Sequence, residues 1–154
     1  MNTSEIRPAR MADASALAKL MEHLGYPTMA GEMEARLTAL LAHSDYQTLV
    51  AECNGHLVGM IGIHLGRYYE KNGVYGRIVA LVVEPEHQGQ HIGSALVAEG
   101  ELWLKTRGVE TIIVNSGTHR QAAHRFYEHL GYQETGIRFV KTFEEQKRLQ
   151  TYGS

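Results

Sequence analysis

The sequence lacks the features that mark secreted, membrane and nucleic-acid-binding proteins, since it has little cysteine, no long apolar stretch and little net charge. A single cysteine, Cys53, excludes an internal disulfide and favours a reducing compartment. No apolar stretch approaches the roughly 20 residues that span a bilayer, and the N-terminal residues lack the pattern of a signal peptide. The formal net charge of -2 gives no basic footprint for nucleic acid or for an anionic membrane. We therefore expect a cytoplasmic protein without a nucleic-acid or membrane partner.

The composition is that of an ordinary globular chain. Hydrophobic residues make up 44% and charged residues 21% of the 154 residues, a length sufficient to bury a core. We find no repeat, low-complexity tract or linker. The sequence therefore predicts one domain over residues 1–154, ending in a polar tail from about residue 144.

The first part of the chain has the apolar spacing of two surface helices. Residues 13–24 and 32–42 each place apolar side chains on one helical face, with Asp13 positioned to cap the first helix. A short strand is expected before them, at residues 4–8. The two helices are expected to cover another layer of the structure.

Strand periodicity follows the helices. Apolar runs at residues 47–53 and 57–65 are separated by Asn54-Gly55, which predicts a tight hairpin because both turn residues need positive φ. A second Asn-Gly pair, at residues 72–73, precedes a third run at residues 74–83. These segments predict an antiparallel meander of three strands.

The remaining segments change the architecture. A helix over residues 92–106 follows the third strand through a glycine-containing loop, and a short β-branched strand follows at residues 111–115. This order predicts a βαβ unit with parallel strands and a right-handed crossover. A further helix at residues 119–130 and strands at 132–135 and 138–143 complete a mixed α+β chain.

The loop at residues 84–94 has features of an anion site. The first N–H groups of a helix lack intrahelical acceptors and lie at the positive end of its dipole, which favours a phosphate. Gly89 would let the backbone approach a ligand closely. No Gly-Lys-Ser/Thr follows and the loop comes after a meander, which excludes a P-loop and a dinucleotide fingerprint. A plain turn into the helix is the alternative interpretation.

Two motifs flank the predicted parallel unit. Leu81-Val82-Val83-Glu84-Pro85 leads into Gln88-Gly89-Gln90-His91-Ile92-Gly93, and Ala123-His124-Arg125-Phe126-Tyr127 leads into Gly131-Tyr132. Together they resemble the GNAT superfamily of acetyl-CoA-dependent N-acetyltransferases, whose signatures are Gln/Arg-x-x-Gly-x-Gly/Ala and Ala-x-x-Phe-Tyr-x-x-x-Gly-Tyr/Phe. His91 replaces the middle glycine of the first signature. Arg120 stands where many relatives have asparagine.

The resemblance implies the GNAT fold, a mixed sheet with a V-shaped cleft between two parallel strands, and acetyl-CoA as the cosubstrate. It implies that the backbone at Leu81, Val82 and Val83 pairs with the pantetheine and polarises the thioester carbonyl. Asn115 and Arg120 are expected to contact the cofactor as well. The pyrophosphate is expected on the loop formed by Gln88, Gly89, Gln90, His91, Ile92, Gly93 and Ser94.

The resemblance also implies direct attack of an amine on the thioester. Tyr127 matches the tyrosine of the family that protonates the departing thiolate, and an aromatic at the edge of the core is its alternative interpretation. A primary amine with a pKa near 10 must lose a proton to a base or a water chain. The candidate bases are Glu84, His64, Glu70 and His119.

Cys53 and the histidines suggest other chemistry that we do not expect. Cys53 has no group beside it in the sequence that would stabilise a thiolate, so a buried filler is favoured over a covalent acetyl-cysteine. His119, His124 and His129 are five residues apart, a spacing that scatters them around a helix. We therefore predict no metal site.

The acceptor is the least determined part of the prediction. Residues 59–65 and 123–127 look similar to the aminoalkylphosphonate N-acetyltransferase branch of the superfamily. Arg67, Arg77 or Arg138 would then bind a substrate anion, the alternative for each being a solvated surface charge. Aminoglycosides, polyamines and a protein N-terminus stay open as acceptors. So do a non-catalytic acetyl-CoA sensor on the same scaffold, and a homodimer.

Overall fold

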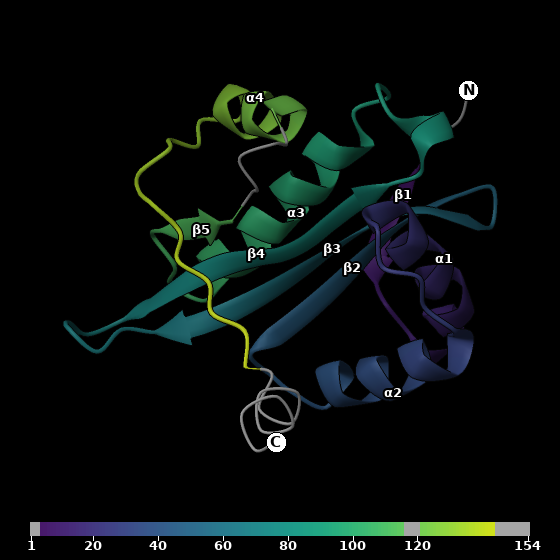
Figure 1. Cartoon of the computed structure of the whole chain (residues 1–154), viewed down its shortest axis with the longest axis horizontal. Coiled ribbons are helices and arrows are strands. Elements are labelled where there is room, and N and C mark those ends of the chain that lie inside the picture. The colour runs from purple at the N-terminus through teal and green to yellow at the C-terminus, as the bar shows by residue number, and fades with distance from the viewer. Residues whose placement is uncertain (1–3, 116–120, 144–154) are drawn as a thin grey trace, which may run out of the picture. The chain divides into compact units, whose positions relative to one another are not determined.

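The computed structural model describes residues 4–115 and 121–143. The chain divides into two compact units, Met1–Asn115 and Ser116–Ser154. The first unit contains the sheet and α1 to α3, and the second contains α4 (Figure 1). Among the described residues of both units, no helix combines the length and apolarity needed to cross a membrane.

The first unit is an α+β arrangement around one five-stranded sheet with the order β1-β2-β3-β4-β5. Neighbouring strands are antiparallel from β1 to β4, and β4 and β5 are parallel, as predicted for the meander and the βαβ unit. The strands are β1 (Glu5–Pro8), β2 (Tyr46–Cys53), β3 (His56–Arg67), β4 (Val74–Val83) and β5 (Ile112–Val114). The helices are α1 (Ala14–Leu24), α2 (Ala30–Leu41) and α3 (Ile92–Thr106), with 3₁₀ turns η1 (Met11–Asp13) and η2 (Pro85–His87).

The two Asn-Gly pairs make different turns. Asn54 and Gly55 have φ angles of 52° and 75°, so the predicted tight hairpin between β2 and β3 is confirmed. In the second pair only Gly73, with φ of 114°, takes a positive angle. This pair ends a longer loop, in which the Tyr68 N–H donates to the Gly73 carbonyl at 3.4 Å.

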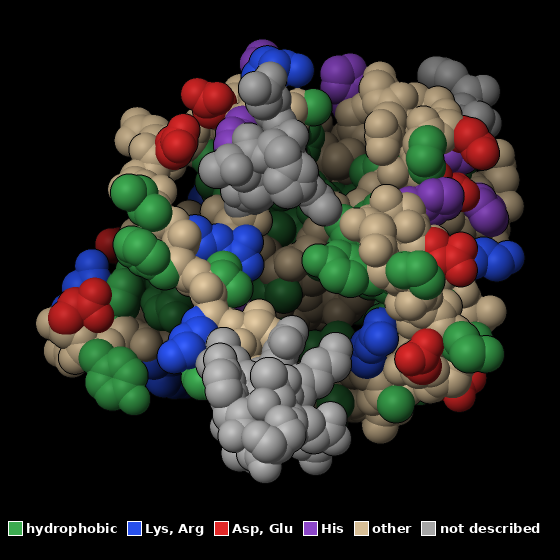
Figure 2. Space-filling view, in the orientation of Figure 1, with side chains coloured by type: hydrophobic (Ala, Val, Ile, Leu, Met, Phe, Trp, Pro, Cys, Tyr) green, Lys and Arg blue, Asp and Glu red, His purple; other side chains and the backbone are tan. Residues whose placement is uncertain are grey.

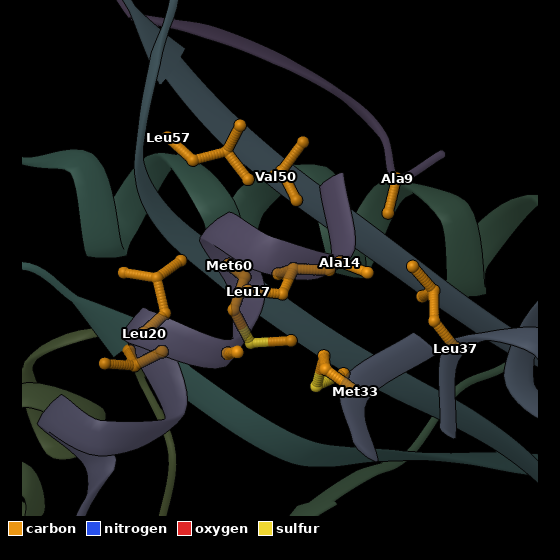
Figure 3. Close-up of a cluster of buried hydrophobic side chains, with 11 residues drawn as sticks. Ala9, Ala14, Leu17, Leu20, Met33, Leu37, Val50, Leu57 and Met60 are labelled. Atoms are coloured by element: carbon orange, nitrogen blue, oxygen red, sulfur yellow. The ribbon is translucent and has the colours of Figure 1, made fainter. Parts of the chain in front are cut away.

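The core lies on both faces of this sheet. Figure 3 shows α1 and α2 packing on one face. Fully burying a leucine such as Leu17 or Leu37 stabilises the fold by roughly 1.5–3 kcal/mol. The buried cluster consists of Ala9, Ala14, Leu17, Ala18, Leu20, Met33, Leu37, Val50, Leu57, Met60 and Val82. On the opposite face α3 approaches closely, since a Cβ on Gly100 would lie 2.7 Å from Cδ1 of Ile63.

Charge is mixed on the surface. Figure 2 shows acidic and basic side chains interspersed over the visible face, so the described side chains form no large patch of one sign there. This distribution agrees with the small net charge of -2.

The second unit begins its described part with α4 (Gln121–His129). The helix ends at His129, Gly131 takes a left-handed φ of 94° just after it, and the Tyr132 N–H donates back to the Tyr127 carbonyl at 3.0 Å. The strands predicted at residues 132–135 and 138–143 were wrong, because residues 132–143 form no strand here. Phe139 and Phe143 are 90% and 72% exposed. An apolar alternation becomes a strand only where a neighbouring edge pairs with it.

Asp13 differs from the predicted cap of α1. Its side chain makes no capping bond to that helix. Instead its carboxylate accepts hydrogen bonds from the Arg7 guanidinium at 2.8 and 2.9 Å and from the Arg10 N–H at 2.7 Å. The hydrogen bonds from Arg7 hold the pKa of Asp13 below its usual value. The buried carboxylate thus fastens β1 to the start of α1.

Asp13→Asn is expected to lower the free energy of unfolding by about 1–3 kcal/mol at pH 7, because it breaks a partly buried charged network. The pKa of Asp13 is lower in the folded chain than in the unfolded chain. Its contribution is therefore present above the unfolded pKa of about 3.9 and is lost as the pH falls through the folded pKa. Urea unfolding from pH 7 to pH 2 measures the difference between wild type and variant.

Glu22→Gln, on the exposed side of α1, is the matched control and should change little. A constant difference between wild type and Asp13→Asn over the whole pH range would contradict this role.

Candidate functional site

The pairing of β4 with β5 stops part-way along β4. Gly76, Arg77 and Ile78 pair with Ile112–Val114, while β4 continues to Val83. Beyond Ile78, no strand in the described part of the chain pairs with the side of β4 that faces away from β3. The sheet therefore has an open edge at the C-terminal end of β4.

A bulge at Val79 determines which amides this edge presents. Gly62 pairs with Ala80 and Ile63 pairs with Ile78, so Val79 is an extra residue in β4. Before the bulge, the Gly76 N–H points away from β3 and donates to the Thr111 carbonyl at 2.9 Å.

After the bulge the amide directions are exchanged: even-numbered residues now point their N–H groups toward β3, and odd-numbered residues point theirs away from it. The Glu84 N–H points toward β3 and donates to the Val58 carbonyl at 2.8 Å. Because N–H directions alternate along a strand, the Val82 amide also faces β3, whereas the Leu81 and Val83 amides face the open edge. Of the three predicted backbone contacts, the structure brings two to that edge.

The loop after β4 turns the chain into α3 with two left-handed residues. Gly89 has φ of 83° and His91 has φ of 65°. A side chain in this region costs about 1 kcal/mol relative to glycine, so His91 keeps the backbone conformation that glycine would take without strain. The first helical bond is donated by the Ala95 N–H to the His91 carbonyl at 3.0 Å. The N–H groups of Ile92, Gly93 and Ser94 come before this first bonded donor and therefore have no intrahelical acceptor.

The Glu84 side chain supports this loop. Its two carboxylate oxygens lie 3.0 and 3.1 Å from Nε2 of His56, at the β2–β3 hairpin. Nδ1 of His87 is buried 3.8 Å from the same carboxylate, without a hydrogen-bond partner among the described residues. The predicted role of Glu84 as a base stays a prediction, and its carboxylate already has a partner.

Glu84, Glu86 and His87 are also the described residues that offer ligand atoms within 4.8 Å of one another, as a metal ion requires. Glu86 is exposed and Glu84 is already paired with His56, so this group gives no specific reason to assign a metal.

Two further residues predicted to contact the cofactor, Asn115 and Tyr127, are placed by the structure. Asn115 directly follows β5 and is exposed. Tyr127 lies in α4, where its ring centroid is 5.1 Å from that of Phe126 and 5.6 Å from that of Tyr132. Burial raises the pKa of Tyr127 to about 12, so the hydroxyl keeps its proton at neutral pH. Arg120 and His119 lie outside the described residues.

Three other candidates, His64, Arg67 and Glu70, lie toward the end of the meander opposite the loop. His64 faces Tyr46, with ring centroids 4.5 Å apart, and pairs in register with Arg77. Arg67 ends β3, and Glu70 lies exposed in the loop that follows. Cys53 is buried, in agreement with its predicted packing role.

Comparison with known proteins identifies the family of the chain. The model of the acetyltransferase (GNAT) family matches residues 16–132, a stretch that runs across both compact units. The chain belongs to the GNAT acetyltransferase family. The predicted family, the α+β fold and the acetyltransferase activity are thereby confirmed, and acetyl-CoA is the acetyl donor of the family.

Two relatives show how this GNAT acetyltransferase compares in sequence. It is 39% identical over 88 residues to an aminoalkylphosphonate N-acetyltransferase of Salmonella typhimurium, a match that covers 57% of either chain. It is 29% identical over 134 residues to an aminoglycoside N(6')-acetyltransferase of Stenotrophomonas maltophilia, which covers 84% of this chain and 86% of the relative.

Solved structures agree on the fold of the GNAT acetyltransferase. A GNAT family acetyltransferase of Staphylococcus aureus superposes with a TM-score of 0.80 at 29% identity, covering 93% of this chain and 100% of that one. An aminoglycoside N-acetyltransferase in complex with CoA superposes with a TM-score of 0.83 at 15% identity, covering 94% and 97%.

His91→Val is expected to lower the free energy of unfolding by about 1–2 kcal/mol, because a β-branched residue is poorly tolerated at a positive φ. His91→Asn is the matched control, since asparagine tolerates the left-handed region. Urea unfolding of the GNAT acetyltransferase measures both changes, and calorimetric titration with CoA should show a larger dissociation constant for the valine variant alone. Equal stability of the two variants would contradict the assigned backbone conformation.

Proposed function

We propose that this chain transfers the acetyl group of acetyl-CoA to the primary amine of a small molecule by direct attack on the thioester. The observation that carries the proposal is the open edge of β4, which presents the Leu81 and Val83 amides. These donors suit the amide and carbonyl groups of a pantetheine arm laid along the edge as an additional strand.

The edge also supplies the electrostatic part of the reaction. A fixed N–H donor aimed at the thioester oxygen stabilises the negative charge that develops there by roughly 3–4 kcal/mol. The pyrophosphate is assigned to the N-terminus of α3, whose first amides have no intrahelical acceptor. We assign the loop Gln88–Ser94 to this contact, and Asn115 and Arg120 to further contacts with the same cofactor. The two compact units together would then form one acetyltransferase domain.

The reaction requires two proton movements. The amine nitrogen attacks the thioester carbon, the C–S bond breaks, and CoA leaves as a thiolate. Tyr127 is assigned to protonate that thiolate, and its pKa of about 12 keeps the phenol neutral at pH 7 and able to donate. The proton of the amine passes to a base or to water. Of the predicted bases, Glu84, His64, Glu70 and His119 all stay open, and the Glu84 carboxylate also holds the loop through His56.

The names of the relatives support a small amine as the acceptor. One is called an aminoalkylphosphonate and the other an aminoglycoside N-acetyltransferase. A peptide N-terminus and a non-catalytic acetyl-CoA sensor are the alternatives. The cytoplasmic location and a homodimer stay predictions.

The acceptor class can be tested by thiol release from acetyl-CoA in the presence of a panel of amines. The panel contains aminomethylphosphonate, spermidine, an aminoglycoside and a short peptide with a free N-terminus. Turnover with one or more small amines is expected, at a rate well above the background hydrolysis of acetyl-CoA. Turnover with the peptide alone would support a protein acetyltransferase, and CoA binding without any turnover would support a sensor.

Tyr127→Phe is expected to lower kcat by about 10²-fold, because general acid catalysis contributes on that scale. The dissociation constant of CoA should stay within about twofold of wild type, since the ring is kept. Steady-state kinetics and calorimetry measure the two effects. Tyr132→Phe, on the neighbouring ring, is the control. A wild-type kcat in Tyr127→Phe would remove this residue as the acid.

A further inference from the structure

The face of the sheet that binds α1 and α2 is only partly covered by these helices. They bury Met60 of β3 and Val82 of β4. Figure 1 shows that the hairpin end of β3 and β4 extends beyond both helices. Near that end of the sheet Arg77 is exposed, and Tyr46 of β2, His64 and Tyr75 are half-buried. We call these four residues the polar floor.

The alternation of side chains places the floor residues of β4 on this face. A Cβ on Gly76 would lie 2.9 Å from Cδ2 of Leu104, so Gly76 faces α3. Its neighbours Tyr75 and Arg77 therefore face the opposite side, because successive residues of a strand alternate. Their common face is the one on which α1 and α2 pack.

The floor residues of β3 and β2 share that face. Ile63 faces Gly100 of α3, so His64 faces away from α3. The Tyr46 ring lies against His64, with centroids 4.5 Å apart. The Tyr75 ring lies over Gly66, where an added Cβ would be 2.7 Å from its Cε1.

Arg77 is the cation of the polar floor. It pairs in register with His64, and its side chain is exposed without a carboxylate partner among the described residues. It comes two residues before the bulge at Val79, after which the Leu81 amide faces the open edge. Their register partners on β3, His64 and Ile61, are three residues apart, so at about 3.3 Å per residue Arg77 and Leu81 are roughly 10 Å apart along the sheet. A small molecule can span that distance.

We propose that the polar floor binds the acceptor and that Arg77 selects amines carrying a carboxylate or phosphoryl group. A guanidinium binds such groups with two parallel hydrogen bonds, and the flat rings of Tyr46 and His64 support the intervening carbons. The other predicted arginines fit less well, because Arg67 is at the tip of the hairpin and Arg138 is in the second unit. This inference rests on the proposed function, since the amine must reach the thioester at the edge of β4.

The test compares two amines that differ in one anionic group, 3-aminopropyl phosphate and 3-amino-1-propanol. In Arg77→Gln, KM for the phosphate should rise about tenfold or more, because the charged hydrogen bonds are lost, while KM for the alcohol should change less than about twofold. Arg77→Lys should restore part of the difference as a point charge. Arg67→Gln, also on an exposed side chain, is the matched control and should leave both KM values unchanged.

The failures of the two proposals are distinguishable. If wild type acetylates either amine but Arg77→Gln changes both KM values equally, or neither, the role of Arg77 is overturned and the proposed function stands. If wild type acetylates neither amine, calorimetric binding of 3-aminopropyl phosphate to wild type and Arg77→Gln tests the floor directly. Binding that is weakened in the variant supports the floor, and binding that is absent or unchanged overturns it.

Discussion

The bulge at Val79 is the constraint on which the site depends. It inserts one residue into β4 against β3, so the amides beyond it change direction relative to those before it. The parallel pairing with β5 ends at Ile78, immediately before the bulge. A regular β4 would have pointed the Val82 amide outward instead, and Leu81 and Val83 would have bonded to β3. The bulge therefore decides where the edge can receive a ligand.

The packing of α3 adds an anion site to the open edge. Gly76 and Gly100 let the helix lie close to the sheet, where larger residues would collide with Leu104 and Ile63. The helix begins a few residues after β4, so its unbonded N-terminal amides follow the donors of the edge along the chain. The contact between Glu84 and His56 holds the connecting loop to the β2–β3 hairpin. One stretch of chain thus carries a row of donors for an extended arm and an anion site for its phosphates.

Local signals in the sequence were sufficient for much of this architecture. Asn54 and Gly55 specified a tight hairpin because both residue types tolerate positive φ, and the predicted helix over residues 92–106 has the observed bounds. The signature showed that His91 replaces a glycine, but the backbone conformation of His91, with φ of 65°, became known only from the structure. Tyr127 and the loop were named from motifs, and their contacts with cofactor stay predictions.

Features that depend on distant pairing could not be predicted. The sequence around Val79 does not mark it as a bulge among its apolar neighbours, because the bulge arises from the register with β3. Glu84 was a candidate base in the sequence, and only the fold shows His56, 28 residues away, against its carboxylate. Asp13 had the position of a helix cap, but Arg7 offered it a stronger, charged partner. Apolar alternation at residues 138–143 predicted a strand without supplying the edge that a strand needs.

Amide hydrogen exchange, resolved by residue with NMR and measured with and without CoA, tests the central claim most directly. Saturating CoA should slow exchange at Leu81 and Val83, whose amides face the open edge, and at Ile92 to Ser94. The Val82 amide, already bonded to β3, should change little by comparison. Equal protection of all three β4 amides, or none at Leu81 and Val83, would contradict the account.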